Sequence, residues 1–319
     1  MDYRPQFDSL RGLAVACVLF SHFWFPISCL GTLGVLVFFV LSGFLITSIL
    51  LEHPGLGAFY KRRALRLLPA FYIAVLSAIA LNLPGMRDTW PWHVFQATNI
   101  YFAVQGNWSG PWMTAHLWSL NVEEQFYAIW PLILKLPRRW LPWAFAGVAL
   151  LAPIYRNVAP GFWSDITPMA SFDALGAGAL LVLFPRRVVY LGFAAGPLVL
   201  SGLLWPADWN GFTTLGSVAL AAALVLAARN GKLTWIERPL LIWLGKISYG
   251  VYLYHLFVWA IVQHFTGRFD AAGWQAMLVC SVLTIAVATL SYRFIERPLR
   301  RQGSPTFVVA ARLLGNARK

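Results

Sequence analysis

The stretch LGVLVFFVLSGFLITSILL, residues 33–51, holds nineteen consecutive positions without one charged side chain. A helix of about 20 apolar residues is long enough to cross the hydrocarbon core of a bilayer. Comparable apolar runs lie on both sides of this stretch, separated by prolines, glycines and charged clusters. The pattern therefore predicts an all-α fold, a polytopic bundle of membrane-spanning helices.

The composition supports the same interpretation. Of the 319 residues, 59% are hydrophobic and only 12% are charged, whereas about a quarter of the residues in an ordinary soluble domain are charged. The formal charge of +13 comes from small groups of Lys and Arg between apolar runs. Such groups are typical of topology determinants and not of a nucleic-acid surface. The three cysteines have no CxxC spacing, and we expect no metal site.

Prolines, glycines and charge clusters divide the chain into ten predicted spans. They run from Leu10 to Ser28, Leu33 to Leu51, Leu67 to Leu83, Leu117 to Leu136, Trp140 to Ile154, Pro168 to Phe184, Val188 to Trp205, Phe212 to Ala228, Ser248 to Phe265 and Gly273 to Phe294. The apolar segment from Pro91 to Gln105 is too short to span, and we expect it to lie on the membrane surface or to be re-entrant. Residues 1–302 then form one membrane domain, followed by a basic cytoplasmic tail, residues 303–319.

The orientation follows from Lys and Arg, which accumulate on the cytoplasmic side of membrane proteins. With the amino terminus inside, only Arg87, Arg156 and Arg268 fall on the outer side. We therefore expect both termini in the cytoplasm.

Polar residues inside the apolar runs are the candidates for function, because ionisable groups are costly in a bilayer. Arg11 and His22 are eleven positions apart, so a helix places them within about 20° on one face and separates them by roughly 16 Å along the axis. His22 is a candidate general base. The alternative is a snorkelling Arg and a His that bonds a neighbouring helix.

A group of arginines lies near the cytoplasmic side. Arg62, Arg63 and Arg66 follow Lys61, and the spacing of Arg63 and Arg66 suits a phosphate held between two guanidinium groups. The positive-inside rule and lipid headgroups explain the same charges.

The fourth span brings several polar groups into one apolar helix. His116, Glu123 and Tyr127 share a face, with Glu124 alongside. A glutamate there can orient a neighbouring His or Arg, or complete a structural ion pair.

The ninth and sixth spans carry the remaining candidates. Ser248, Tyr252 and His255 share one face of the ninth span, where an aromatic belt would also explain the tyrosine. Asp173 is a lone carboxylate in the sixth span, and Arg156 is its expected partner.

Taken together, six stretches resemble the acyltransferase 3 family of bacterial integral-membrane O-acyltransferases. They are FDSLRGLAVACVLFSHF, GTLGVLVFFVLSGFLIT, YKRRALRLLP, HLWSLNVEEQFY, ISYGVYLYH and FIERPL. The resemblance implies a multi-pass protein of the bacterial inner membrane and makes Arg11 and His22 the family's essential pair. It assigns Arg63 and Arg66 to acyl-CoA and places His116, Glu123, Glu124 and Tyr127 in a family motif. Some relatives carry a fused extracytoplasmic domain, and we expect this chain to be the stand-alone form.

The resulting hypothesis is transfer of an acyl group, with acetyl expected, from acyl-CoA to a hydroxyl of a cell-envelope glycan, a lipid-linked acceptor or an exported metabolite. His22 acts as general base or as a covalent relay, supported by Arg11 and by Glu123 or Glu124. The remaining candidate residues are assigned either to the acyl donor or to the acceptor. We assign Arg62, Arg63, Arg66, Tyr252 and His255 to acyl-CoA, and His116, Tyr127, Asp173 and Arg156 to the acceptor.

Two alternatives stay open at this point. Intramembrane His, Glu and Asp also suit a proton-coupled transporter of a small polar solute. An unrelated membrane-bound acyltransferase family built on an Asn/His pair would use His255 instead. Membrane lipids are the expected surroundings in every case, and the oligomeric state leaves no mark in the sequence.

Overall fold

A computed structural model of the chain describes residues 4–24, 28–52, 55–159, 161, 166–183, 196, 197, 200, 211–266 and 274–302. This described part contains helices and turns and no strand, which confirms the all-α prediction. The longer helices are α1 (Pro5–Phe23), α2 (Ser28–Glu52), α3 (Leu56–Ala80), α6 (Leu117–Ile133), α7 (Leu141–Val158), α9 (Phe172–Leu183), α12 (Gly211–Arg229), α14 (Ser248–Thr266) and α15 (Trp274–Ser291). The shorter ones are α4 (Trp90–Val94), α5 (Thr98–Gln105), α13 (Pro239–Lys246) and α16 (Arg297–Gln302).

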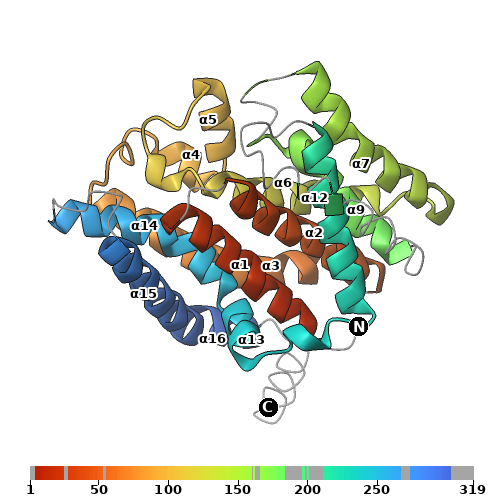
Figure 1. The fold of residues 1–319 in the computed structure, drawn as a ribbon. Helices are drawn as coiled ribbons and strands as arrows, with labels where there is room; N and C mark the ends of the chain where they lie inside the picture. Colours follow the sequence, from red (N-terminus) through yellow and green to blue (C-terminus); the bar gives the residue numbers. More distant parts are fainter. Residues whose placement is uncertain are drawn as a thin grey trace, which may run out of the picture.

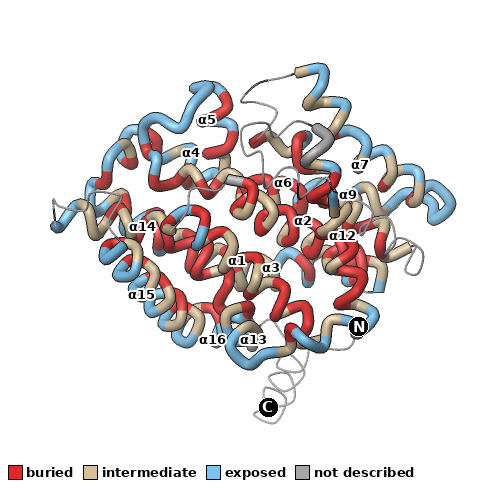
Figure 2. The backbone as a smooth tube through the Cα atoms, in the orientation of Figure 1, coloured by how far each residue is buried: buried red, intermediate tan, exposed pale blue. Residues whose placement is uncertain are grey.

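The helices α1 and α2 form the middle of the bundle. Figure 1 shows α14 and α15 on one side of them and α7, α9 and α12 on the other, with α4 and α5 above. The tube in Figure 2 is mostly buried along α1 and α2, and exposed faces appear on α7 and α15. Large apolar side chains occupy those outer faces, among them Trp143, Val158 and Leu290, which are 72%, 79% and 56% exposed. An apolar outer surface is what a lipid environment requires.

Several helix pairs approach through glycine, among them α2 with α9 and α1 with α13. A Cβ atom on Gly43 of α2 would collide with the carbonyl oxygen of Leu175 in α9. A Cβ atom on Gly245 of α13 would collide in the same way with the carbonyl oxygen of Asp8 in α1. Small residues at such contacts let helix backbones pack directly, as is common in membrane proteins. The contact with α13 fixes the first turns of α1, where Arg11 lies.

Within the described residues, three helices are long and apolar enough to cross a membrane by themselves. They are Cys29–Glu52, Leu56–Ala80 and the continuous stretch Trp274–Arg300, which includes a π-helical turn at Tyr292–Glu296. The pair Pro239–Lys246 and Ser248–Thr266, bent by 68°, makes a fourth if it is counted as one span. The protein is therefore a membrane-embedded helical bundle, and the ten-span topology with cytoplasmic termini stays a prediction.

Several helix limits differ from those expected. The third span was expected to begin at Leu67 after a loop, but α3 begins at Leu56 and continues through Pro69. Lys, Arg, Ala and Leu favour helix, so the cationic stretch extends the helix by itself. The segment from Pro91 to Gln105 forms two helices of five and eight residues, each too short to span. The expected span Val188 to Trp205, except for residues 196, 197 and 200, and the tail 303–319 lie outside the described residues.

Candidate active site

Two cavities lie along one face of α1. We call the first the arginine cavity, which has a volume of about 140 Å³ and is lined by Arg11, Arg63, Arg66 and Glu123 among others. Its walls come from α1, α2, α3, α6 and α14. Three guanidinium groups and a single carboxylate give this cavity an excess of positive charge.

The second is the histidine cavity, with a volume of about 410 Å³. His22 from the last turn of α1 and His116 from the residue before α6 line it, together with apolar side chains of α2 and α14. Val35 and Tyr252 line both cavities, so the two spaces share a wall. Arg11 and His22, which the spacing placed on one helical face, thus line two neighbouring cavities and not one common cavity.

The arginines of the first cavity differ in their partners. The Arg63 guanidinium stacks on the Tyr127 ring, with 3.6 Å between its central carbon and the ring centroid. It also lies 3.9 Å from a carboxylate oxygen of Glu123. That carboxylate accepts hydrogen bonds from the hydroxyl groups of Tyr127 and Ser42. Arg63 is therefore held by α6 and has a neutralising neighbour.

Arg66 has no comparable neighbour. It lines the arginine cavity but makes no hydrogen bond or ion pair with another residue in the part of the chain that the structure describes. Arg11 forms an ion pair with Asp8 across one turn of α1, with 3.2 Å between Nη1 and Oδ1. Arg62, expected in the same group, is not among the residues that line the cavity. Arg66 is therefore the guanidinium most available to an anionic ligand.

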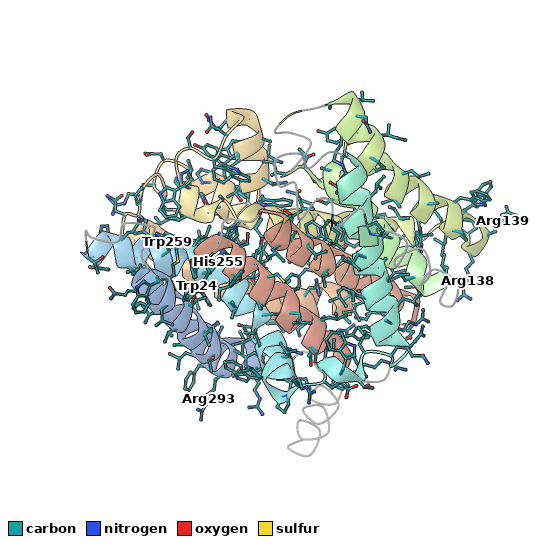
Figure 3. The ribbon with its side chains drawn as sticks, viewed as in Figure 1. Trp24, Arg138, Arg139, His255, Trp259 and Arg293 are labelled. Carbon is teal, nitrogen blue, oxygen red and sulfur yellow. The ribbon has the colours of Figure 1, made fainter. Side chains whose placement is uncertain are left out.

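Three histidines meet beside the histidine cavity. The Nδ1 atom of His22 lies 2.9 Å from Nε2 of His255, and the rings are stacked with centroids 5.0 Å apart. The Nδ1 atom of His255 lies 2.7 Å from the carbonyl oxygen of Tyr252. Nε2 of His116 lies 3.0 Å from the carbonyl oxygen of Leu253. Phe23 packs against both His255 and Trp259, and Figure 3 shows Arg138, Arg139 and Arg293 pointing away from the bundle.

The shared wall between the cavities is held by hydrogen bonds. The Tyr252 hydroxyl lies 2.5 Å from Oγ of Ser119 and donates to the carbonyl oxygen of His116 at 3.0 Å. These contacts tie α14 to the start of α6.

The two glutamates of α6 do not reach His22. Glu123 bonds Ser42 and Tyr127, and neither glutamate forms a hydrogen bond with any histidine that the structure describes. Both line a small space beside Leu67 and Tyr249. The group that orients His22 in this structure is His255, which the sequence analysis assigned to acyl-CoA.

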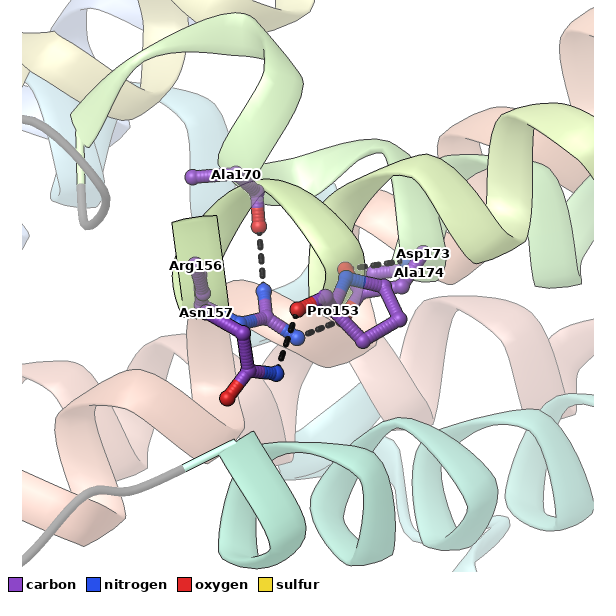
Figure 4. Close-up of polar contacts among 6 residues, drawn as sticks. All are labelled: Pro153, Arg156, Asn157, Ala170, Asp173 and Ala174. Atoms are coloured by element: carbon purple, nitrogen blue, oxygen red, sulfur yellow. Dashed lines mark hydrogen bonds and ion pairs between the residues drawn. The ribbon is translucent and has the colours of Figure 1, made fainter. Parts of the chain in front are cut away.

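Asp173 and Arg156 form the ion pair that their sequence predicted. Arg156 Nη2 lies 2.5 Å from Oδ2 of Asp173, and Nη1 donates to the carbonyl oxygen of Ala170 at 2.6 Å. Asp173 Oδ1 accepts the backbone N–H of Ala174 at 2.8 Å. Figure 4 shows how this network joins α7 to the start of α9. The pair lines neither the arginine cavity nor the histidine cavity.

Sequence reasoning missed Ser42 and Ser119, which hydrogen-bond the functional candidates. Each is a single hydroxyl in an apolar helix, a weak signal. It also missed the contact between His22 and His255, because spacing within one helix says nothing about its partner on another.

The sequence is similar to a known protein family and to several named proteins. A family model described as an acyltransferase domain matches residues 4–293. The chain is 29% identical over 351 positions to the Listeria monocytogenes protein named peptidoglycan O-acetyltransferase OatA, covering 94% of this chain and 56% of that relative. It is 27% identical over 366 positions to nodulation protein 10 of Rhizobium leguminosarum, covering 98% of this chain and 96% of that relative. The chain thus spans a little over half the length of the Listeria protein. No solved structure matches it.

Proposed function

Because the chain belongs to the acyltransferase family whose model matches residues 4–293, we propose that it is an O-acyltransferase of the bacterial inner membrane. It moves an acyl group, with acetyl expected, from acyl-CoA to a hydroxyl of a cell-envelope glycan, a lipid-linked acceptor or an exported metabolite. The Listeria relative is named a peptidoglycan O-acetyltransferase, and this supports acetyl transfer to a glycan. Nothing in the site favours the transporter alternative.

The observation that carries the proposal is the shared wall of the two cavities. The arginine cavity is suited to an anionic donor, and the histidine cavity holds an imidazole beside open space. Val35 and Tyr252 belong to both. A thioester that extends from the arginines past this wall arrives at His22, where a hydroxyl acceptor can meet it.

The donor end rests on Arg66, with Arg11 and Arg63 beside it. Guanidinium groups bind phosphate through charge-assisted hydrogen bonds. Arg66 forms no hydrogen bond or close ion pair with a described residue, and Glu296 attracts it only at longer range, so its N–H groups are left for the phosphates of CoA. The cavity of about 140 Å³ is far smaller than a nucleotide, so it suits the narrow pantetheine arm, with the nucleotide outside its mouth.

The chemistry at His22 is general base catalysis. Its Nδ1 is engaged by His255, and its Nε2 makes no hydrogen bond with another described residue. Nε2 accepts the proton of the acceptor hydroxyl while the hydroxyl oxygen attacks the thioester carbonyl carbon. The carbon–sulfur bond then breaks, and the thiolate of CoA takes that proton from the imidazolium. General base catalysis of this kind contributes about 10² to 10⁴-fold.

The test uses purified protein in detergent with acetyl-CoA and an envelope glycan fraction, and follows release of free CoA thiol. We expect the wild type to consume the thioester and His22→Ala to lose about 10² to 10⁴-fold in turnover. His264→Ala is the matched control, because His264 is exposed near the end of α14. Normal turnover by His22→Ala contradicts the assignment. A wild type that leaves acetyl-CoA intact with every acceptor contradicts the enzyme proposal and favours a carrier.

A further inference from the structure

His255 contacts His22, the proposed general base, and is buried behind it. It is completely buried, with 0% of its surface exposed, and lines neither the arginine cavity nor the histidine cavity. Rings of Phe23 and His116 pack against it, with centroids 6.0 Å and 4.6 Å away. A side chain in this position touches no substrate and acts only through its neighbours.

The hydrogen-bond partners determine where the protons lie. The carbonyl oxygen of Tyr252 can only accept, so the Nδ1 atom of His255, 2.7 Å away, carries a hydrogen. A neutral imidazole carries one N–H, so Nε2 of His255 has a free lone pair. The atom that faces this lone pair at 2.9 Å is Nδ1 of His22, which must therefore be the donor.

The same reasoning fixes the other nitrogen of His22. With its single hydrogen on Nδ1, neutral His22 has its lone pair on Nε2. That is the nitrogen without a partner among the described residues, and His22 lines the histidine cavity. The backbone of α14 thus sets the protonation of a ring on α1 through one intervening imidazole.

We propose that His255 is a positioning residue that holds His22 in the tautomer with a free Nε2 lone pair. The inference rests on the proposed function of His22. His255 also accepts a charge-assisted hydrogen bond once His22 is protonated, and so it stabilises the imidazolium that forms during transfer. Base and orienting group are related as in other catalytic dyads, with an imidazole where a carboxylate is more usual.

The first test compares two substitutions of similar size. In His255→Gln the amide oxygen reaches about as far as imidazole Nε2 and can accept from His22. In His255→Asn the amide ends near the position of Nδ1, so it can still bond the Tyr252 carbonyl but cannot reach His22. We expect kcat within about 10-fold of wild type for the Gln variant and about 100-fold lower for the Asn variant. The KM for acetyl-CoA should change in neither.

His264→Gln on the same helix is the control, and thermal unfolding of each variant shows that it is folded. Equal turnover of folded Gln and Asn variants, whether normal or lost, overturns the inference while loss in His22→Ala keeps the proposed function. Normal turnover in His22→Ala overturns the proposed function itself.

A second measurement needs no substitution at His255. The ¹⁵N NMR spectrum of histidine-labelled wild-type protein in detergent distinguishes protonated from unprotonated ring nitrogens, and the His22→Ala spectrum identifies the His22 signals. At a pH where the ring is neutral, we expect a protonated Nδ1 and an unprotonated Nε2. The opposite tautomer overturns the inference.

Discussion

Arg156 and Arg66 show two uses of the same charged group inside one helical bundle. Arg156 is bonded to a carboxylate that is 2% exposed and to a backbone carbonyl oxygen, and it lies away from both cavities. Arg66 lines the arginine cavity and has no such partner among the described residues. An arginine bonded to a carboxylate and to a backbone carbonyl joins helices, whereas one without a close counter-ion beside a cavity can bind a ligand. The difference lies in the partners and not in the residue type.

The largest expected effect is on folding and comes from the bonded arginine. Asp173→Ala leaves the Arg156 guanidinium buried without its carboxylate, which destabilises a protein by about 3 to 5 kcal/mol. Thermal unfolding in detergent measures the loss, with Asp88→Ala as the control because Asp88 is exposed. An unfolding temperature equal to that of the wild type would contradict a structural role for the pair.

For Arg66 we expect an effect on donor binding and little effect on stability. Arg66→Gln removes a guanidinium group that makes no hydrogen bond or close ion pair with a described residue, so we expect the unfolding temperature to change little. A hydrogen bond to a charged group contributes about 1.5 to 3 kcal/mol, which corresponds to a KM for acetyl-CoA about 10 to 100-fold higher. Arg62→Gln is the matched control, since Arg62 is not among the residues that line the cavity. Equal KM changes in the two variants would remove the distinction between them.

Arg63 lines the cavity like Arg66 but has a carboxylate neighbour like Arg156. A change at its support should have the smallest of the three effects. Tyr127→Phe removes the hydroxyl that bonds Glu123 and keeps the ring beneath the guanidinium. Because the Ser42 hydroxyl still bonds the same carboxylate, the free energy of unfolding should fall by only about 1.5 kcal/mol, and the KM should stay nearly unchanged. A KM as high as that of Arg66→Gln would show that the hydroxyl meets the donor directly.

Much of the fold could be predicted because it depends on local pattern. The apolar runs gave the all-helical class, and the start of α14 at Ser248 agrees with the expected span. The family match confirms the resemblance identified from six motifs. The start of α3 was misplaced, because the cationic stretch before Leu67 was taken as a loop although its residues favour helix.

The site was predicted less completely, because its contacts join distant parts of the chain. His22 and His255 are separated by 233 positions, and spacing shows only which face each residue occupies. For the same reason the partner of Asp173 was easier to predict, since Arg156 is only 17 positions away, near the outer end of the preceding span. The catalytic and binding roles of the predicted residues stay predictions.

The wall that Val35 and Tyr252 contribute to both cavities has a thermodynamic consequence. A molecule that shifts the Tyr252 ring from one side reshapes the space on the other side, so the two occupancies are linked. Linkage is reciprocal: whatever factor the donor applies to acceptor affinity, the acceptor applies to donor affinity. Measuring the affinity for either substrate at fixed concentrations of the other would therefore give this coupling factor.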